Sequence, residues 1–159
     1  MPDNLNERDI GWPKKLIAGI DEAGRGPWAG PVVSAAVILN EKNIPDGLND
    51  SKKLSEKKRL SLYSSIYNFH SVGVGISSIE EIDSMNVLQA TFLSMKRAVE
   101  DLNPQPEYIL VDGNLDPGLN FKTKCIIKGD SISISIAAAS VIAKVTRDNL
   151  MLKLDKEFP

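Results

Sequence analysis

The apolar residues of this chain follow two periodicities, one typical of β-strands and one typical of α-helices. Short runs rich in Val, Ile and Ala alternate with longer segments in which apolar residues recur every three or four positions. Gly, Pro, Asn and Asp lie at the boundaries between them. The pattern predicts strands at 16–22, 32–39, 71–76, 108–111 and 124–128, and helices at 55–69, in the two segments between Ser78 and Asn103-Pro104, and from within 133–136 to Lys156.

Two local patterns add detail to these elements. Ser78 and Glu81 fit a capping box, which predicts a helix start. Glycines alternate with apolar residues at 71–76, which predicts a strand packed closely on one face. Strands first, followed by helices alternating with strands, predict an α/β fold in which helices flank a mixed central β-sheet. Functional sites in open sheets of this kind lie beyond the strand ends.

The polar residues 1–14 are expected to form a loosely held N-terminal lead before a domain that spans 15–159. A chain of 159 residues with 42% hydrophobic and 25% charged residues suits one soluble, globular domain. Because the formal net charge is −2, a nucleic-acid partner would have to be held by a local basic patch rather than by net charge.

Composition also bears on the compartment. Cys125 is the one cysteine, which excludes an internal disulfide and a multi-cysteine zinc site, and its apolar neighbours predict a buried, inert thiol. The N-terminal residues lack the apolar core of a secretory signal. The longest apolar stretch, at 134–143, has half of the roughly 20 residues that a membrane span needs. We expect a cytoplasmic protein that does not enter the membrane.

Four acidic residues, Asp21, Glu22, Asp112 and Asp130, lie in or just after predicted strands. Any one of them could simply end its strand at the solvent edge. Together they indicate a metal site, because clustered carboxylates repel each other and bound divalent cations remove that cost. Consecutive strand residues point to opposite faces, so Asp21 and Glu22 can share a site only if the strand ends or bends there, which Gly24 makes possible.

The glycine-rich segment Gly24-Arg25-Gly26 follows the first two acids. It is not a dinucleotide-binding loop, because the next glycine comes one residue late and Pro27 would break the helix that must follow. It is either a hairpin turn or a backbone clamp on a phosphodiester, to which Arg25 would add a charged fork for phosphate. Trp28, beside it, is expected to be a packing residue or to touch a ligand.

Basic residues concentrate at Ser51-Lys52-Lys53 and Lys57-Lys58-Arg59, which form either a solvated face or a surface that follows phosphates. Ser140, Lys144 and Arg147 recur at i, i+4 and i+7, so they share one helix face. That face either reaches a phosphate or points into water. The single histidine, His70, is expected to be structural. A serine or cysteine nucleophile would need this histidine as its general base, so the sequence does not favour either kind of nucleophile.

Five segments in this order resemble bacterial ribonuclease HII, the type 2 ribonuclease H. The similarity runs from about Lys15 to the last residue, and five segments in register are far more specific than any one. They are Asp21-Glu22-Ala23-Gly24-Arg25-Gly26-Pro27, Leu48-Asn49-Asp50-Ser51-Lys52-Lys53-Leu54, Val111-Asp112-Gly113-Asn114, Lys128-Gly129-Asp130-Ser131 and Ala143-Lys144-Val145-Thr146-Arg147-Asp148.

The resemblance implies a ribonuclease H-like fold and an endonuclease that hydrolyses the RNA strand of RNA–DNA hybrids, including single ribonucleotides embedded in duplex DNA. The products would carry 3′-hydroxyl and 5′-phosphate ends, and the cofactor would be Mn²⁺ or Mg²⁺ in a two-metal mechanism. The implied catalytic acids are Asp21, Glu22, Asp112 and Asp130, of which Asp21, Glu22 and Asp112 hold the metal. The implied substrate-binding residues are Gly24, Arg25 and Gly26 at the ribose 2′-OH, Lys52 and Lys53 on the nucleic-acid backbone, and Ser140 and Lys144 near the phosphate.

The chain departs from the family in its C-terminal part. Members continue past the position where this sequence stops, through a segment whose tyrosine stacks beside the ribonucleotide junction. We therefore expect a monomeric catalytic domain that lacks this region. Two alternatives stay open: a catalytically impaired fragment of the same fold that binds hybrids, and a metal phosphohydrolase that acts on small phosphate esters.

Overall fold

The computed structural model describes residues 1–26 and 29–158, so the expectations for Pro27 and Trp28 lie outside the described residues. Its five strands are β1 (Ile17–Ala23), β2 (Val32–Ile38), β3 (Ser71–Ser77), β4 (Tyr108–Asp112) and β5 (Lys122–Ile126). Its helices are α1 (Leu5–Ile10), α2 (Glu56–Phe69), α3 (Ile79–Met85), α4 (Val87–Glu100) and α5 (Ile134–Glu157), with short 3-10 helices η1 (Ser51–Lys53) and η2 (Gly129–Ser131).

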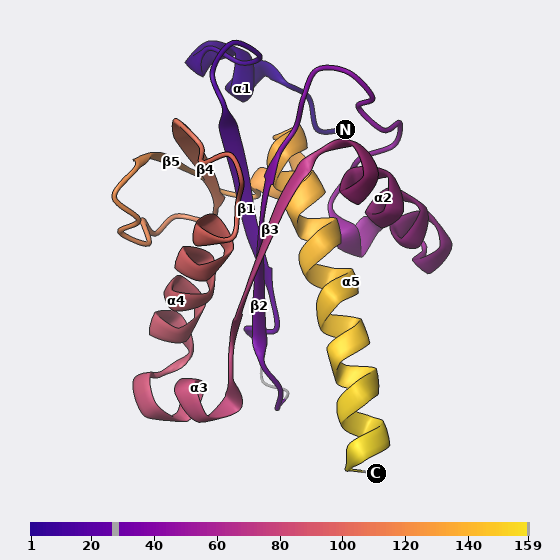
Figure 1. Ribbon diagram of the computed structural model, residues 1–159, viewed down its shortest axis with the longest axis vertical. Helices are drawn as coiled ribbons and strands as arrows, with labels where there is room; N and C mark the ends of the chain where they lie inside the picture. The colour runs from indigo at the N-terminus through magenta and orange to yellow at the C-terminus, as the bar shows by residue number, and fades with distance from the viewer. Residues whose placement is uncertain (27–28, 159) are drawn as a thin grey trace.

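The strands form one mixed sheet in the order β3-β2-β1-β4-β5. The β1, β2 and β3 strands are antiparallel neighbours, whereas β4 and β5 run parallel to β1. Parallel strands need a crossover, and α3 and α4 supply it between β3 and β4. The chain thus forms the predicted α/β fold with a mixed central sheet flanked by helices (Figure 1).

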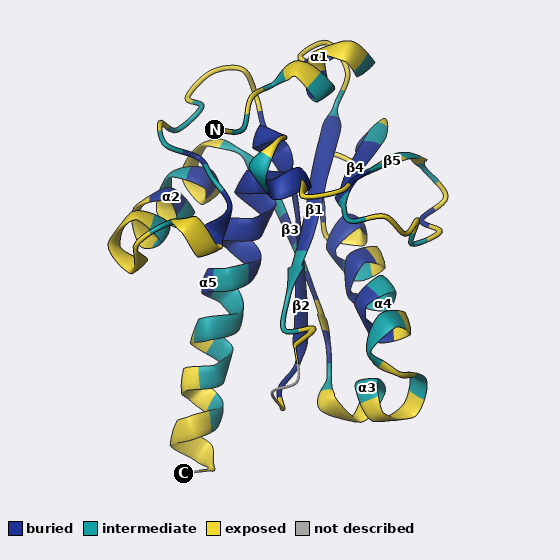
Figure 2. Cartoon of the chain, turned by 180° about the vertical axis from the view of Figure 1, so that it is seen from behind, coloured by how far each residue is buried: buried dark blue, intermediate teal, exposed yellow. Residues whose placement is uncertain are grey.

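Helices cover both faces of the sheet. Apolar side chains of α4 pack with Ala36 and Ile38 of β2 on one face, and those of α5 and α2 pack with Ala35 and Val37 on the other. Alternate residues of one strand therefore serve two cores. Helix α5 is buried along its N-terminal half, where it crosses the sheet, and is exposed toward its C-terminal end (Figure 2).

The glycines of β3 have a packing reason. A Cβ atom at Gly73 or Gly75 would collide with the backbone of α4, so these residues let the helix lie directly on the strand. This confirms the prediction of a strand packed closely on one face.

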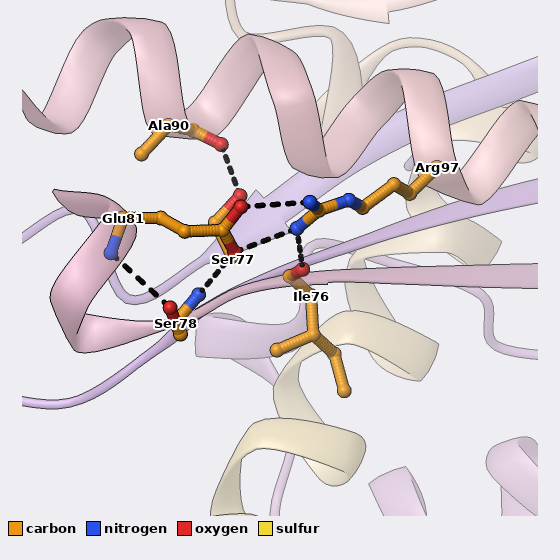
Figure 3. Close-up of polar contacts among 6 residues, drawn as sticks. All are labelled: Ile76, Ser77, Ser78, Glu81, Ala90 and Arg97. Atoms are coloured by element: carbon orange, nitrogen blue, oxygen red, sulfur yellow. Dashed lines mark hydrogen bonds and ion pairs between the residues drawn. The ribbon is translucent and has the colours of Figure 1, made fainter. Parts of the chain in front are cut away.

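The outer edge of β3 is bonded to side chains of the α4 region. The Val74 N–H donates to Asp101 Oδ2 at 3.0 Å, and Arg97 donates to the Ile76 carbonyl at 2.7 Å. Arg97 also binds both carboxylate oxygens of Glu81 at 2.7 Å, and Glu81 completes the predicted capping box with Ser78 (Figure 3).

Most predicted elements agree with the structure, and the differences lie near the site. The last strand was predicted at 124–128 but ends at Ile126, and Asp130 lies in η2 rather than directly after the strand. Neither 3-10 helix was predicted. Cys125 is half-buried rather than buried, and partial burial raises the pKa of its thiol.

The first fourteen residues are not the loosely held lead that their polarity suggested. They contain α1, Trp12 is buried and donates to the Leu39 carbonyl at 2.9 Å, and the Glu7 side chain is fully buried. His70 is structural, as expected, with its ring nitrogens bonded to the backbone of Asn40 and Asn43. None of the helices in the described part of the chain is both long and apolar enough to cross a membrane.

Candidate active site

Three of the four candidate carboxylates lie together at the end of the sheet where β4 stops pairing with β1. The pairing of β1 with β4 ends at Ile20 and Val111, while β1 continues to Ala23 with β2 alone. Beyond that point Asp21 comes from β1, Asp112 is the last residue of β4, and Asp130 comes from η2. One oxygen of each lies within 4.8 Å of the others.

Burial and the repulsion of like charges act together in this group, which we call the acid cluster (Asp21, Asp112 and Asp130). Burial and the charge of Asp112 raise the pKa of Asp21 well above its usual range, and the charges of Glu22 and Asp130 act in the same direction. Burial and the charge of Asp112 also raise the pKa of Asp130 to about 6, helped by the nearby Asp50. Among the described residues, the salt bridges do not include any member of the cluster.

Glu22 lies beside the acid cluster rather than in it. Its backbone N–H donates to Asp21 Oδ1 at 2.8 Å, and its Oε1 lies 3.6 Å from the Arg25 guanidinium. Burial raises the pKa of its carboxyl group and the charge of Asp112 adds to this, whereas Arg25 lowers it. Its second oxygen, Oε2, is buried without a hydrogen-bond partner in the described structure, so it is available to a ligand.

A cavity of about 530 Å³ opens beside Glu22. It brings together side chains that the sequence places in three separate segments, and this confirms that Ser140, Lys144 and Arg147 share one face. Its lining is Glu22, Ala23, Gly24, Arg25, Gly26, Ser51, Lys52, Ser140, Lys144, Arg147 and Asp148.

The fold requires glycine at only one of the two glycine positions in the Gly24-Arg25-Gly26 loop. Gly24 has φ +102°, and a Cβ atom there would collide with Arg147 and with the Pro31 carbonyl, which itself accepts from Arg147 Nε at 3.0 Å. A Cβ atom at Gly26 would meet no atom of residues 1–26 or 29–158 within 4 Å. The fold therefore needs the first glycine but not the second, and the bare backbone at Gly26 is open to a ligand.

The predicted substrate-binding residues of η1 and α5 differ in the partners that they contact. Ser140 accepts from the Ser51 N–H at 3.2 Å, which ties η1 to α5 and leaves the exposed Lys52 at the cavity. Lys53 Nζ donates to Ser131 Oγ at 3.1 Å, so it lies over η2. Lys144 pairs with Asp148 at 3.0 Å across one helical turn.

Sequence reasoning missed two residues here. Asp50 is buried and caps η1 by accepting from the Lys52 N–H at 3.0 Å, and its carboxylate acts on Asp130. An acidic residue two positions before Lys52 is a capping signal that could have identified it. Arg147 was assigned to phosphate or water, but its Nε supports the glycine loop; no local sequence signal indicates this contact.

A second large cavity, of about 590 Å³, lies at the opposite end of the sheet. It is lined by residues before β1 and after β2, among them Lys15, Asn40 and His70. It contains none of the four candidate acids, so the chemistry of the chain concentrates at the other end.

The chain is similar to known proteins. A family model described as ribonuclease HII matches residues 18–159, a range that contains all four acids and the whole cavity lining. The chain belongs to the ribonuclease HII family. It is therefore an enzyme of the ribonuclease H class, an endoribonuclease, as the resemblance of the five segments implied.

Relatives named ribonuclease HII are similar over most of the chain. The protein of Jannaschia sp. is 53% identical over 159 residues, which is 99% of this chain and 78% of that protein. The protein of Wolbachia pipientis from Culex pipiens is 56% identical over 145 residues, which is 91% of this chain and 74% of the relative.

Solved structures agree in fold. The ribonuclease HII of Archaeoglobus fulgidus, solved in a complex with PCNA, matches 90% of this chain and 78% of its own with a TM-score of 0.78 at 30% identity. The ribonuclease H2 of Pyrococcus horikoshii matches 89% of this chain and 76% of its own with a TM-score of 0.70 at 32% identity.

Proposed function

We propose that this ribonuclease HII cuts the RNA strand of RNA–DNA hybrids and also cuts duplex DNA at single embedded ribonucleotides, using Mn²⁺ or Mg²⁺. The observation that carries the proposal is the acid cluster, in which three carboxylates from separate elements converge and, in the part of the chain that the structure describes, form no salt bridge. Oxygen ligands at such spacing suit hard divalent cations. The raised pKa values of Asp21 and Asp130 support the fit, because a bound cation would offset both the burial and the repulsion that raise them.

The proposed ligands are Asp21, Glu22 and Asp112, with Asp130 completing the catalytic group. Glu22 fits this role because its buried Oε2 has no partner in the described structure and its carboxyl group lies within the field of Asp112. Divalent cations bound there would supply a hydroxide nucleophile at neutral pH and would stabilise the leaving 3′-oxygen.

The cavity beside Glu22 provides the proposed substrate site. The exposed backbone at Gly26 would admit the ribose and its 2′-OH, the group that distinguishes RNA from DNA. Arg25 and Lys52 are exposed at the same cavity and would bind the phosphates on either side, with Lys53 and Lys144 further along the strand. Ser140 would act by holding η1 in place.

This arrangement uses no histidine. His70 lies at the opposite end of the sheet with both ring nitrogens bonded to backbone. Hydrolysis through activated water, rather than attack by the 2′-OH, would leave a 5′-phosphate and a 3′-hydroxyl.

The deciding experiment is cleavage of a labelled DNA duplex that carries one ribonucleotide, with Mn²⁺ or Mg²⁺ and with an all-DNA duplex as control. We expect one cut on the 5′ side of the ribonucleotide, none in the all-DNA duplex, and none after chelation. Binding of the hybrid by folded protein without any cut would instead favour a hybrid-binding protein. Turnover of nitrophenyl phosphate with no preference for ribose would favour a small-ester phosphohydrolase.

A further inference from the structure

A buried carboxylate links the N-terminal helix to the start of α5. Glu7 Oε2 accepts from Ser133 Oγ at 2.7 Å and from the Ser135 N–H at 2.9 Å. Glu7 and both serines are fully buried. Ser133 is also the N-cap of α5, because its hydroxyl accepts from the Ile136 N–H at 3.2 Å. The Glu7 carboxylate therefore completes the cap of the longest helix, where the helix dipole favours a negative charge.

Backbone bonds fasten the same two segments together. The Asp3 N–H donates to the Ile132 carbonyl and the Ile134 N–H donates back to the Asp3 carbonyl, both at 3.0 Å. These bonds and the carboxylate contacts hold residues 3–7 across residues 132–135. We call residues 3–7 the strap.

The segment under the strap connects Asp130 to the fold. Only Ser131 and Ile132 separate Asp130 from the cap of α5, and the Ser133 N–H donates to the Gly129 carbonyl at 2.7 Å. The Asp130 N–H in turn donates to Asp112 Oδ1 at 3.3 Å. A shift of Ser133 would therefore move η2 and change how Asp130 meets Asp112.

We propose that Glu7 is a positioning residue for the metal site, acting through Ser133 and Ser135 to hold η2, and with it Asp130, in register with Asp21 and Asp112. The proposal rests on the proposed function for its consequence in metal binding. The ribonuclease HII family model matches residues 18–159, so the strap lies N-terminal to the matched range.

The hydrogen bonds of Glu7 favour a role in positioning η2 over a role in stabilising the fold alone. Glu7 Oε1 and Ser135 Oγ are both buried without partners in the described structure. A buried carboxylate with one bare oxygen is a costly way to fill space, and an apolar side chain would fill it without that cost. The bonds at Oε2 are what an apolar side chain could not supply.

The test compares Glu7→Ala, Glu7→Gln and Val99→Ala. Val99 is a residue of α4 that is buried against the other face of the sheet, so its truncation destabilises the fold without touching the strap. All measurements are made well below the unfolding temperature of each variant. The two readouts are the Kd for Mn²⁺ by calorimetry and the hydrogen-exchange rates of the amides at 129–136.

We expect Glu7→Ala to raise the Kd for Mn²⁺ about tenfold and to speed exchange at 129–136 about tenfold or more. Val99→Ala should leave both within twofold of the parent chain. Glu7→Gln should also remain close to the parent, because its amide oxygen can still accept from Ser133 and Ser135.

Two results would overturn the proposal: unchanged exchange at 129–136 in Glu7→Ala, or a rise in Kd that Val99→Ala matches. Failure of the proposed function would look different, because the parent chain itself would then not bind Mn²⁺. In that case the exchange rates still decide whether Glu7 holds η2.

Discussion

Asp21 and Glu81 are both carboxylates placed beside a strand end, yet their surroundings move their pKa values in opposite directions. Glu81 binds Arg97 through two bonds of 2.7 Å and also accepts from the Ser78 backbone, which lowers the pKa of its carboxyl group to about 2. Asp21 is buried among other acids, and its pKa is raised well above the usual range.

The difference separates an acid with a structural role from an acid that we propose binds a ligand. Glu81 has its partners within the chain, joining α3, α4 and the edge of β3. The acid cluster lacks such partners among the described residues, so its repulsion is left for a ligand to relieve. The surroundings of a carboxylate thus decide whether it is satisfied within the fold, as at Glu81, or left in need of a ligand, as we propose for Asp21.

The largest expected effect comes from neutralising the acid cluster. We expect Asp21→Asn to lower cleavage of an embedded ribonucleotide by about 1000-fold or more, since a metal ligand is lost. Its unfolding temperature without metal should rise by a few degrees, because a buried like charge is removed. Asp46→Asn, at an exposed acid, is the matched control for both assays. Cleavage by Asp21→Asn at the parent rate would show that the cluster is not the active site.

The loop Gly24-Arg25-Gly26 offers a second comparison, because we expect one of its glycines to serve the fold and the other to serve substrate binding. Gly26→Ala should reduce kcat/KM about tenfold through crowding of the ribose, with an unchanged unfolding temperature because none of the described residues comes within 4 Å of the added Cβ atom. Gly24→Ala should lower the unfolding temperature by several degrees, since its φ of +102° and Arg147 leave no room. Steady-state kinetics and thermal unfolding of both variants test this. A Gly26→Ala enzyme with the kcat/KM of the parent would show that this backbone is not part of the substrate site.

The acid cluster should also make stability without metal depend on pH. Asp130 has a folded pKa of about 6, above its usual 3.8, so the folded state binds its proton more tightly than the unfolded state does. The contribution of Asp130 to the free energy of unfolding is then fully present below about pH 4 and is lost as pH rises toward 6. With a chelator, we expect the unfolding temperature to fall by a few degrees between pH 4 and 7, and less so in Asp130→Asn.

Divalent metal should reverse this loss above pH 7. At a free Mn²⁺ concentration 100 times its Kd, binding to the folded state alone adds about 2.7 kcal/mol, or roughly 5–10 °C for a chain of this size. An unfolding temperature at pH 7.5 that ignores Mn²⁺ would contradict a metal site in the cluster.

The smallest expected effect concerns the ion pair of α3 and α4. Glu81→Gln should leave cleavage within twofold of the parent, because neither Glu81 nor Arg97 lines the cavity beside Glu22. Since the folded pKa of Glu81 is about 2 against a usual 4.5, its contribution is present above pH 4.5 and is lost as pH falls toward 2. Acid unfolding of the parent and the variant should therefore differ above pH 4.5 and converge near pH 2.

Much of the fold could be predicted because periodicity reports directly on burial. The strands at β1, β2 and β3 and the helix α5 were placed within a residue or two of their observed bounds. The end of β5 was misplaced because apolar character continues to Ile127, which is exposed, past the last strand pairing at Ile126. Local apolarity does not show where strand pairing stops.

The site was predicted less completely. The four acids could be identified because carboxylates at strand ends are costly without a ligand. Glu7 could not, since an acid in a polar segment gives no sign that Ser133, 126 positions later, will bury it. The same holds for Arg147, whose partner Pro31 is 116 positions away. Contacts between distant segments are set by the packing of helices on the sheet.

The bonds along the outer edge of β3 have a consequence for a protein that would work on long polymers. Asp101 and Arg97 already occupy a donor and an acceptor of the edge strand. A strand with free backbone groups is a template onto which another chain can add, and crowding of several copies along one duplex would favour that addition. With these groups occupied, neighbouring copies would find less backbone to pair with, which would protect them from aggregating edge to edge.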